Sequence, residues 1–366
     1  MKVLVIGGTG IISTDVCLEC VKQGIELTVV NRGKRGNLDS VKQVIADVRN
    51  EKLETLRNKI GNQIYDVVVD FLSYNEEQLK RTVDIADFKQ YVLVSTATVY
   101  EENESHVYDE GATKGNHGWS YCKNKSKCEK LLKAIAEERG FFYTIVRPYV
   151  TYSEKRFPYQ ICPGEYYTLI YRIKEQLPVP ICGIDSMTTV TSSKDFAKGF
   201  VGLLGNEKSY NEDFHITSDK QIRWREIVEI MAEKYGVKCE FIDFSRSFFE
   251  NGNSEIIDFD EIFFDKSRNM KFDNKKIRSV VPDFVANETF KDCADAVFDY
   301  FEKESNQRIN YLWMGCLDRL IEEYSGKIVE KEVYEFSSDK AKLMYTIGRS
   351  KVLSAIYKGM KMIKHI

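Results

Sequence analysis

Residues 1–13 read MKVLVIGGTGIIS, a short apolar strand that runs directly into a glycine-rich turn. A continuous apolar run is typical of a parallel strand buried on both faces. Glycines at its end allow a tight turn, and the helix that follows directs its free N–H groups and partial positive charge at a ligand there. Gly7, Gly10 and Ser13 have the G-x-x-G-x-x-G spacing, with serine in the last place. The stretch therefore predicts a pyrophosphate site, with a plain structural turn as the alternative.

Length and composition bound the class of protein. The 366 residues include 53 basic and 56 acidic ones, and a net charge of −3 gives no indication of nucleic-acid binding. No apolar run reaches the roughly 18 residues that span a bilayer, and the N-terminus is itself a core strand, so we expect a cytoplasmic protein. The nine cysteines lack metal-ligand spacing, so we expect no metal. Cys17 and Cys20 fall inside the first predicted helix, where we interpret them as core thiols.

Strands and helices alternate through the first half of the chain. After a helix at 12–23, this alternation predicts βαβ units and a doubly wound parallel sheet of the Rossmann type, an α/β fold. Right-handed crossovers bring every strand's carboxyl end, and hence the ligand, to one edge. We expect this dinucleotide-binding domain over 1–150 with segments near 185–220 returning to it, a smaller substrate-binding lobe over 151–305, and a helical extension over 306–366. The predicted strands after the first are residues 27–30, 44–46, 66–71, 91–96 and 142–146, and a helix is predicted at 78–87.

The second predicted strand ends in a basic turn. An acidic residue at this point binds the ribose 2′-hydroxyl of NAD in the dinucleotide fold, whereas this chain carries Asn31 and Arg32, followed by Lys34 and Arg35. Cations suit a 2′-phosphate, so the local charge leans to NADP, with NAD or a merely solvated basic turn as alternatives. Asp47, after the third strand, is placed to meet an adenine edge. The remaining cofactor contacts are expected in the glycine turn and at strand ends: Gly7, Thr9, Gly10, Ile11, Ile12, Val48, Phe71 and Leu72.

Tyr121 and Lys125 begin a predicted helix that is closed by Gly140. Their i, i+4 spacing places both side chains on one helical face. An ammonium beside a phenol stabilises the phenolate and lowers the tyrosine pKa from its usual value near 10, which makes Tyr121 a general acid/base. Thr96, at the end of the fifth strand, presents its hydroxyl to the same substrate oxygen. A Tyr-x-x-x-Lys spacing is common by chance, but the order of glycine turn, Ser-Thr strand end and Tyr-Lys pair is specific.

These motifs resemble the extended short-chain dehydrogenase/reductases, the NAD-dependent epimerase/dehydratase group. Arg147-Pro148 after the sixth strand is similar to that group's strand-end Arg-Pro, and Asp195-Phe196-Ala197 is similar to its later D-x-A element. The resemblance covers roughly residues 1–305. It implies an enzyme that acts by hydride transfer on sugars carried by nucleoside diphosphates.

The resemblance also implies roles for individual residues. Tyr121 is then the catalytic base, and Lys125 is both its pKa partner and a ligand of the cofactor ribose. Thr96 is the hydroxyl that orients the substrate, with Ser95 as its near-equivalent neighbour. Arg147 joins the expected cofactor contacts.

Two departures from the family pattern keep alternatives open. The group's 4,6-dehydratases carry Asp-Glu directly after the catalytic threonine, whereas this chain has Ala97 and Thr98, as the 4-epimerases do. We therefore expect an epimerase or a reductase, with a dehydratase that uses Cys122 and Glu110 as one alternative. The Asn31-Arg32 strand end resembles a divergent branch that includes the chloroplast stem-loop-binding proteins, some of which bind RNA. A non-catalytic dinucleotide- or RNA-binding protein is thus the second alternative, against which the intact Thr96, Tyr121 and Lys125 speak.

The second half of the chain supplies the expected substrate contacts and the tail. Tyr149, Tyr152 and Arg156 can clamp an aromatic base and a phosphate, or pack as an ordinary loop. Amphipathic helices are predicted at 310–324 and, as one helix, at 339–366. The second can lie on an anionic membrane, or pack on its own domain or on a homodimer mate, and we expect a homodimer. Its apolar stripe is Met344, Ile347, Leu353, Ile356, Met360 and Ile363, and its basic residues are Lys342, Arg349, Lys351, Lys358, Lys361 and Lys364.

Overall fold

The computed structural model describes residues 1–34, 36, 38–116, 118–330 and 334–363, with side chains as far as residue 361. Arg35, Lys364 and the side chain of Ile363, which the sequence analysis named, lie outside these described residues. The chain divides into two units. Unit 1 comprises residues 1–153, 189–221 and 270–290, and unit 2 comprises residues 154–188, 222–269 and 291–366.

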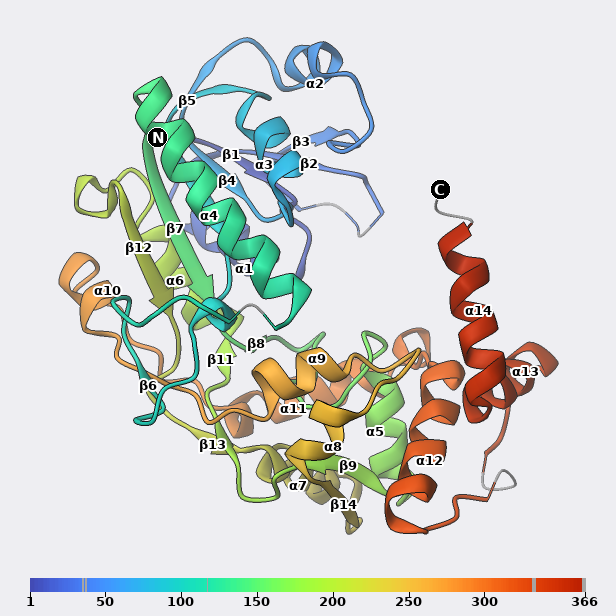
Figure 1. Ribbon diagram of the computed structural model, residues 1–366. Coiled ribbons are helices and arrows are strands. Elements are labelled where there is room, and N and C mark those ends of the chain that lie inside the picture. The colour runs from blue at the N-terminus through green and yellow to red at the C-terminus, as the bar shows by residue number, and fades with distance from the viewer. Residues whose placement is uncertain (35, 37, 117, 331–333, 364–366) are drawn as a thin grey trace. The chain divides into compact units, whose positions relative to one another are not determined.

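Unit 1 is built on a seven-stranded parallel sheet with the order β12-β7-β5-β4-β1-β2-β3 (Figure 1). β1 lies between β2 and β4, so the direction of winding reverses beside it, which is where doubly wound sheets bind ligands. The predicted α/β fold of the Rossmann type is therefore confirmed. The strands are β1 (Lys2–Ile6), β2 (Glu26–Asn31), β3 (Lys42–Ile45), β4 (Ile64–Asp70), β5 (Asp87–Val94), β7 (Phe142–Pro148) and β12 (Glu212–Ile216).

β5 begins earlier than the sequence predicts, and the helix before it ends earlier. α3 spans Glu76–Val83 rather than reaching residue 87, because Asp87 already pairs with Ile64 of β4. The first residues of β5 are polar, so the local sequence pattern does not predict a strand there. Its charges find partners across the fold, since Asp87 pairs with Arg57 at 2.8 Å and Lys89 with Asp66 at 3.1 Å.

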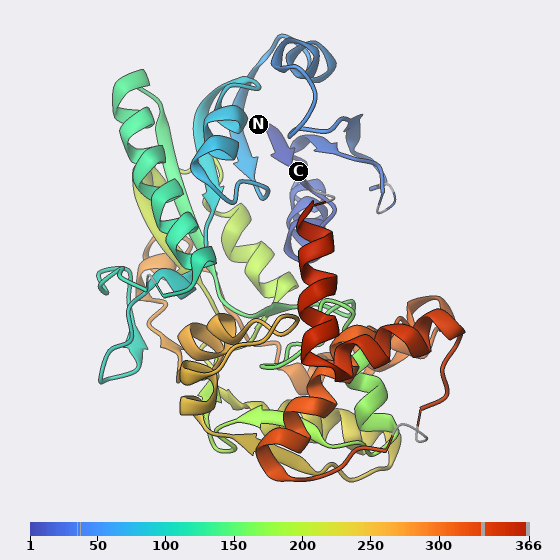
Figure 2. The same ribbon diagram turned by 45° about the vertical axis from the view of Figure 1, so that its right-hand side comes forward.

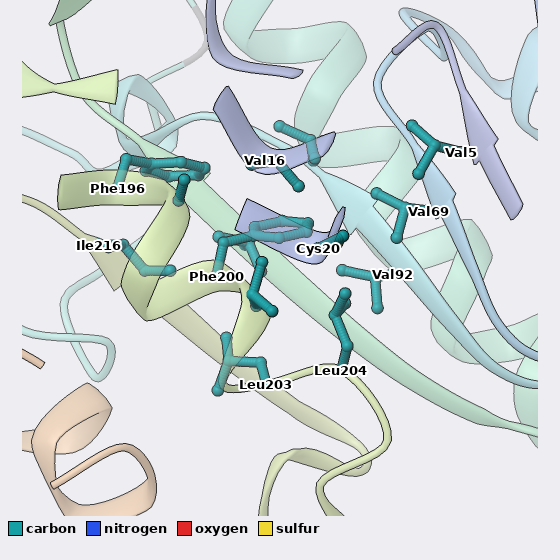
Figure 3. Close-up of a cluster of buried hydrophobic side chains, with 14 of the residues drawn as sticks. Val5, Val16, Cys20, Val69, Val92, Phe196, Phe200, Leu203, Leu204 and Ile216 are labelled. Carbon is teal, nitrogen blue, oxygen red and sulfur yellow. The ribbon is translucent and has the colours of Figure 1, made fainter. Parts of the chain in front are cut away.

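Alternate residues of the buried strands enter two different cores. Val3 and Val5 of β1 pack toward α1 (Ile11–Lys22) and α6 (Ser193–Val201), whereas Leu4 and Ile6 pack toward the opposite face. That face is covered by α2 (Leu53–Ile60), α3 and α4 (Ser120–Arg139). Figure 3 shows the first cluster, in which Val5, Val69 and Val92 of three adjacent strands meet Val16 and Cys20 of α1 and Phe196 and Phe200 of α6. Each such side chain contributes about 1.5–3 kcal/mol when it is fully buried.

The two cysteines of α1 are core thiols, as predicted. Cys17 and Cys20 are fully buried in the first cluster. Burial raises the pKa of Cys20 to about 12 and also raises that of Cys17, so both remain protonated thiols.

Short elements complete unit 1 around the sheet. Two parallel pairs join β6 (Val107–Tyr108) to β15 (Lys271–Phe272) and β8 (Thr151–Tyr152) to β11 (Thr191–Ser192). They bring the returning segments 189–221 and 270–290 back to this unit. The other elements are η1 (Ala97–Val99), η2 (Glu207–Ser209) and α10 (Lys275–Val280).

Unit 2 is mainly helical around two small sheets. A parallel pair joins β9 (Val179–Cys182) to β14 (Phe241–Phe244), and an antiparallel pair joins β10 (Met187–Thr188) to β13 (Ile222–Arg223). No helix among the described residues combines the length and the apolar character needed to cross a bilayer. The helices are α5 (Tyr167–Lys174), α7 (Trp224–Tyr235), α8 (Arg246–Asn251), α9 (Phe259–Glu261), η3 (Ile262–Lys266), α11 (Phe290–Phe301), η4 (Glu304–Asn306), α12 (Tyr311–Ser325), α13 (Asp339–Arg349) and α14 (Lys351–Ile363).

A buried ion pair ties the C-terminal helices into unit 2. Arg172 of α5 donates to Asp318 of α12 at 2.6 Å, and neither side chain is exposed. The hydroxyls of Tyr334 and Tyr345 donate to the other oxygen of Asp318, at 2.5 and 2.8 Å. Trp313, Leu317 and Leu320 of α12, among others, pack in the same apolar cluster as Phe244 and Phe259. Helix α12 is therefore part of the core of unit 2.

The tail contains two helices rather than the single helix predicted at 339–366. Ser350 is extended between α13 and α14, with φ −106° and ψ 119°. Just before this break, α13 packs closely on α12: a Cβ at Gly348 would lie 2.1 Å from the carbonyl oxygen of Leu312, and one at Gly315 would lie 2.2 Å from that of Tyr345. The apolar stripe is consequently divided, because α13 packs on α12 while α14 exposes its part.

Candidate active site

The glycine turn lies between β1 and α1, beside the point where the winding of the sheet reverses. Gly7 has φ +87°, and a Cβ there would lie 2.6 Å from a methyl carbon of Leu72, so both the backbone and the space require glycine. Ser13 accepts from the N–H of Gly10 and donates to the carbonyl of Gly7, both at 2.7 Å. The first turn of α1 holds no acidic residue, so its partial positive charge is not neutralised there. Thr9, Ile11 and Ile12 of the same stretch are partly exposed.

Asp70, at the end of β4, organises the next loop of the site. Its carboxylate accepts from the N–H groups of Leu72 and Ser73, at 2.8 and 3.0 Å. It also accepts from the hydroxyls of Thr82 and Tyr91, at 2.9 and 2.7 Å. No role was predicted for Asp70, although an acidic residue directly after a run of three valines indicates a polar group at the end of a buried strand.

Lys125 joins the ends of β4 and β5. Its ammonium donates to the carbonyl of Ser73 at 2.6 Å and to that of Val94 at 2.9 Å, and the side chain is 5% exposed. Burial lowers the pKa of Lys125. One turn earlier on α4, the partly buried ring of Tyr121 stacks on Tyr74 with centroids 5.7 Å apart and lies 4.9 Å from Trp119. The structure thus brings the start of α4 to the carboxyl edge of the sheet.

Hydroxyl and thiol groups link the end of β5 to the first turn of α4. Thr96 and Thr98 share a hydrogen bond of 2.9 Å between their hydroxyls. The Sγ of Cys122, next to Tyr121, donates to the hydroxyl of Thr98 at 3.2 Å. Thr98 therefore holds the Thr96 hydroxyl and the start of α4 together. This role was not predicted from the sequence, where position 98 was notable only because it lacks an acidic group.

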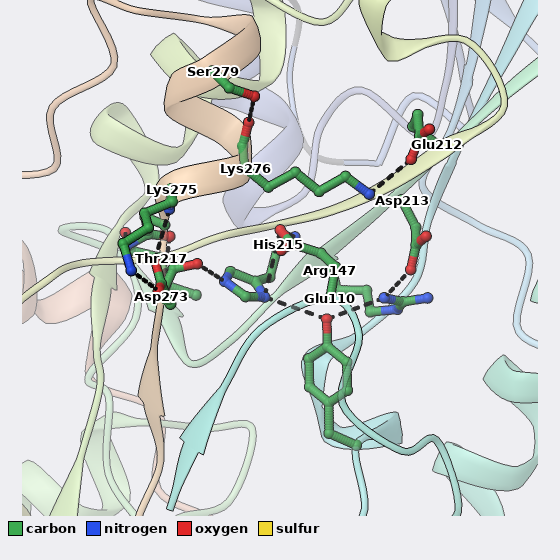
Figure 4. Close-up of polar contacts among 12 residues, drawn as sticks. Glu110, Arg147, Glu212, Asp213, His215, Thr217, Asp273, Lys275, Lys276 and Ser279 are labelled. Atoms are coloured by element: carbon green, nitrogen blue, oxygen red, sulfur yellow. Dashed lines mark hydrogen bonds and ion pairs between the residues drawn. The ribbon is translucent and has the colours of Figure 1, made fainter.

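Ser95 and Arg147 belong to a buried network inside unit 1, and Figure 4 shows the part of it that contains Arg147, Asp213, His215 and Glu110. Ser95 donates to Glu129 at 2.6 Å, and Arg147 donates to both oxygens of Glu129, at 2.8 and 2.7 Å. Arg147 is fully buried and also pairs with Asp213 at 2.5 Å. Burial opposes the ionisation of Asp213, but the nearby charge of Arg147 holds the Asp213 pKa below its usual value. The structure therefore accounts for the Ser95 and Arg147 side chains as interior partners, and neither enters the site proposed below.

Glu110 and His215 form the other end of this network. The hydroxyl of Tyr100 lies 3.1 Å from Arg147 and 3.3 Å from Nδ1 of His215. The N–H of His215 donates to Glu110 at 3.1 Å. Burial raises the pKa of Glu110 to about 7, against that hydrogen bond, and lowers the pKa of His215 to about 4.

Glu110→Gln is expected to gain stability relative to the parent as pH rises. The parent binds a proton on Glu110 in the folded state up to about pH 7, whereas the unfolded carboxyl releases it near 4.5, so folding stability falls between these values. The difference in unfolding free energy should therefore move by about 3 kcal/mol in favour of Glu110→Gln between pH 4 and pH 8. The contribution of His215 cancels in this difference. Urea unfolding of both proteins across this range measures it, and a pH-independent difference would contradict the assignment.

The turn after β2 contains one buried amide side chain, which is bonded within the protein, and cations that are exposed. Asn31 is buried; it accepts from the N–H of Gly33 at 2.7 Å and donates to Gln43 at 3.2 Å. Arg32 and Lys34 are exposed. A hydrogen bond from Asn50 is the main cause that lowers the pKa of Asp47, and the charge of Arg32 adds to it.

The other predicted contacts lie in different surroundings. Val48 is buried and its carbonyl accepts from Arg81, and the ring of Phe71 lies 5.7 Å from that of Phe200.

Tyr149, Tyr152 and Arg156 are divided between the two units. Tyr149 and Tyr152 are buried in unit 1, where the ring of Tyr149 lies 5.2 Å from that of Phe272. The hydroxyl of Tyr152 donates to the carbonyl of Glu288 at 3.2 Å. Arg156 belongs to unit 2, where its guanidinium lies 6.0 Å from the ring centre of Tyr166. The two tyrosines thus pack inside unit 1.

A doubly wound parallel sheet with a glycine turn beside its central strand defines the Rossmann class of α/β proteins. Within that class, residues 3–216 match the model of the NAD dependent epimerase/dehydratase family, and the chain belongs to this family. The predicted resemblance to the extended short-chain dehydrogenase/reductases is therefore confirmed.

Individual relatives agree in fold. The chain is 26% identical over 287 residues to the chloroplast stem-loop binding protein of 41 kDa b of Arabidopsis thaliana, which covers 72% of this chain and 71% of that protein. The structure of epimerase Mth375 from Methanothermobacter thermautotrophicus superposes with a TM-score of 0.66 at 12% identity, over 83% of this chain and 93% of the other. The UDP-glucuronic acid 4-epimerase from Bacillus cereus, solved with UDP-glucuronic acid and NAD, gives 0.64 at 15% identity, over 83% and 99%.

Proposed function

We propose that this protein is an NAD(P)-dependent sugar-nucleotide epimerase or reductase in which Tyr121 is the acid/base. The observation that carries the proposal is the position of Lys125. Its ammonium donates to the carbonyl of Val94 at the end of β5 and to that of Ser73 just after β4, and Lys125 lies one helical turn from Tyr121. Membership of the NAD dependent epimerase/dehydratase family supports it. Residues 1–150 with the returning segment near 185–220 bind the dinucleotide in this proposal, and residues 151–305 bear the substrate contacts, with Arg156 among them.

The residues of the glycine turn fit a dinucleotide. Gly7 makes the bend at φ +87° that turns the chain from β1 toward α1, and the N-terminus of α1 supplies the charge that a pyrophosphate needs. Thr9, Gly10, Ile11 and Ile12 would present their backbone to it, with Phe71 and Leu72 beside them and Asp47 and Val48 toward the adenine. A bound dinucleotide would supply the hydride acceptor and donor for the reaction.

The chain's own side chains manage the proton. Tyr121 takes the proton of the substrate hydroxyl as the hydride leaves that carbon, and gives it back when the carbonyl is reduced. Lys125 stabilises the phenolate form of Tyr121, which is present before the proton is taken and again after it is returned. Thr96, held by Thr98, donates to the same substrate oxygen and fixes its orientation. An epimerase returns the hydride to the opposite face of the ketone, whereas a reductase exchanges its cofactor.

The surroundings of Cys122 and Glu110 do not favour the dehydratase alternative. Cys122 donates to Thr98, and Glu110 accepts from the backbone of His215. Neither contact prepares a proton transfer at two adjacent sugar carbons.

A panel of nucleoside-diphosphate sugars tests the proposal, with chromatography that separates isomers, mass spectrometry of the products and the nicotinamide absorbance as readouts. An epimerase gives an isomer of unchanged mass and no net absorbance change, and a reductase gives an absorbance change with two hydrogens transferred. A product that has lost one water would overturn both in favour of dehydration.

A second candidate is a dinucleotide-fold protein that binds RNA, and it is favoured by the name of the Arabidopsis relative. A gel shift with structured RNA, set against turnover of the sugar-nucleotide panel, separates the two. RNA binding without turnover would leave only this candidate. We further propose a cytoplasmic homodimer, which size-exclusion chromatography with light scattering tests for its oligomeric state.

Arg32→Glu is expected to weaken NADP binding by about 10- to 100-fold, the loss of one charge-assisted hydrogen bond to the 2′-phosphate, while NAD binding stays within a few-fold. Asn31 stands where NAD-preferring proteins carry an acid, and Arg32 and Lys34 are the exposed cations beside it. Titration of both cofactors by calorimetry measures the change. Lys208→Glu, an equal charge change elsewhere on unit 1, is the control. Equal losses for NAD and NADP would contradict the preference.

A further inference from the structure

The C-terminal helices concentrate positive charge on a chain whose net charge is −3. Residues 340–361 contain six basic and no acidic side chains. Arg349 pairs with Glu322 of α12 at 2.7 Å, whereas the other five are exposed. The exposed ones are Lys340, Lys342, Lys351, Lys358 and Lys361.

Helix α14 also exposes one continuous apolar face. Val352, Leu353, Ile356 and Met360 are 69%, 42%, 53% and 53% exposed, and their spacing places them within about 100° of the helix circumference. The lysines of α14 project from the remaining surface. An arrangement with large apolar side chains on one face and cations on the other is typical of helices that lie at an interface.

Contacts within unit 2 leave this apolar face open. Among the described side chains of α14 only that of Ser354 is buried, and its hydroxyl donates to the carbonyl of Ile347 at 2.9 Å. Lys361 lies over the ring of Tyr357 at 5.2 Å, on the helix itself. In Figures 1 and 2, α14 continues from the end of α13 and stands clear of the other helices of unit 2.

We infer that α14 docks the protein on the anionic surface of a lipid bilayer, as an interfacial helix that does not cross it. The apolar face would sink roughly 5–10 Å into the boundary between headgroups and acyl chains. The five exposed lysines would lie within reach of the negative surface potential, where each adds about 1 kcal/mol. The inference is independent of the proposed function, because it uses no residue of the candidate active site.

The two other occupants fit less well. RNA would pair with the lysines but would leave four large apolar side chains in water, and the one arginine of the segment is already paired with Glu322. A dimer in which α14 of one copy packs against α14 of a second copy would bring together two segments that each carry six basic residues and no acidic one. A bilayer with anionic headgroups satisfies both the charge and the apolar face.

Co-sedimentation of the full-length protein with large unilamellar vesicles tests the inference. We expect binding to phosphatidylcholine vesicles that contain phosphatidylglycerol, weakened by added salt, and none to phosphatidylcholine alone. The double variant Leu353→Glu/Ile356→Glu should lose detectable binding. The triple variant Lys351→Gln/Lys358→Gln/Lys361→Gln should lose on the order of 100-fold in affinity, about fivefold for each lysine.

Matched controls separate the helix from general surface properties. Ile64→Glu alters another isoleucine that is more than half exposed, in unit 1, and Lys208→Gln/Lys220→Gln/Lys238→Gln removes three exposed lysines elsewhere. Both should bind vesicles as the parent does, and circular dichroism and turnover should be unchanged in all four variants. Equal binding to both vesicle types, or binding that survives Leu353→Glu/Ile356→Glu, would overturn the inference. So would RNA binding through the same lysines without vesicle binding, or a dimer that Leu353→Glu/Ile356→Glu dissociates.

Discussion

Replacing Tyr121 by Phe is expected to lower turnover of the sugar-nucleotide substrate by about 10²–10⁴-fold, the usual contribution of a general acid/base. The change removes the phenolic oxygen and keeps the ring, which stacks on Tyr74 and contacts the tilted ring of Trp119. Dinucleotide affinity should therefore stay nearly constant, because the proposed cofactor contacts of the glycine turn and of Lys125 remain. Steady-state kinetics and fluorescence titration of the cofactor measure the two quantities separately.

Two companion variants sharpen this test. Tyr74→Phe removes a hydroxyl from the neighbouring ring, and its turnover should fall less than about threefold, because that hydroxyl has no part in the proton transfer. Lys125→Met should lower both turnover and cofactor affinity, because the same ammonium serves the phenolate and the ribose. If Tyr121→Phe and Tyr74→Phe lost activity equally, the loss would belong to ring packing and not to an acid/base. Unchanged turnover in Tyr121→Phe would end the catalytic assignment.

Replacing Asp318 by Ala is expected to lower the free energy of unfolding by about 3–5 kcal/mol. The substitution leaves the fully buried guanidinium of Arg172 without its counter-charge and removes the acceptor of the Tyr334 and Tyr345 hydroxyls. An uncompensated buried charge costs more than the lost attraction itself. Urea unfolding followed by tryptophan fluorescence measures the change, since Trp313 lies on α12 five residues from Asp318.

The double variant Arg172→Met/Asp318→Leu distinguishes a charge effect from a packing effect. Apolar side chains of similar size often restore the stability that the loss of one buried charge removes, so the double variant should recover most of it. Glu323→Ala is the matched control on the same helix and should cost less, because Glu323 is half-exposed and the buried Arg319 keeps its other partner, Glu255. A loss below that of Glu323→Ala would contradict the structural role of the buried pair.

The partners of Arg147 come from distant parts of the chain. Arg-Pro at the end of β7 resembles a cofactor contact, and in the structure its guanidinium pairs with Glu129, Asp213 and Tyr100. These partners lie 18, 66 and 47 positions away, so no local pattern connects them to Arg147. In the same network the Ser95 hydroxyl donates to Glu129, whereas the Thr96 hydroxyl is hydrogen-bonded to that of Thr98.

The sequence by itself determined the features that depend on neighbours along the chain. A buried parallel strand needs a continuous apolar run, as in β1, and the bend after it needs a residue that tolerates φ +87°, which is Gly7. The spacing of Tyr121 and Lys125 places them on one face of α4 because a helix repeats every 3.6 residues. These local rules were enough for the class of the sheet, and they predict the helix face on which the proposed catalytic residues lie.

Only the tertiary structure decided the features that depend on distant partners. Asp70 gained its role from Thr82 and Tyr91, β5 gained its first residues from pairing with β4, and the tail broke at Ser350 where Gly348 packs on α12. Burial and pairing are properties of the surroundings of a side chain, and the folded chain alone brings those surroundings together.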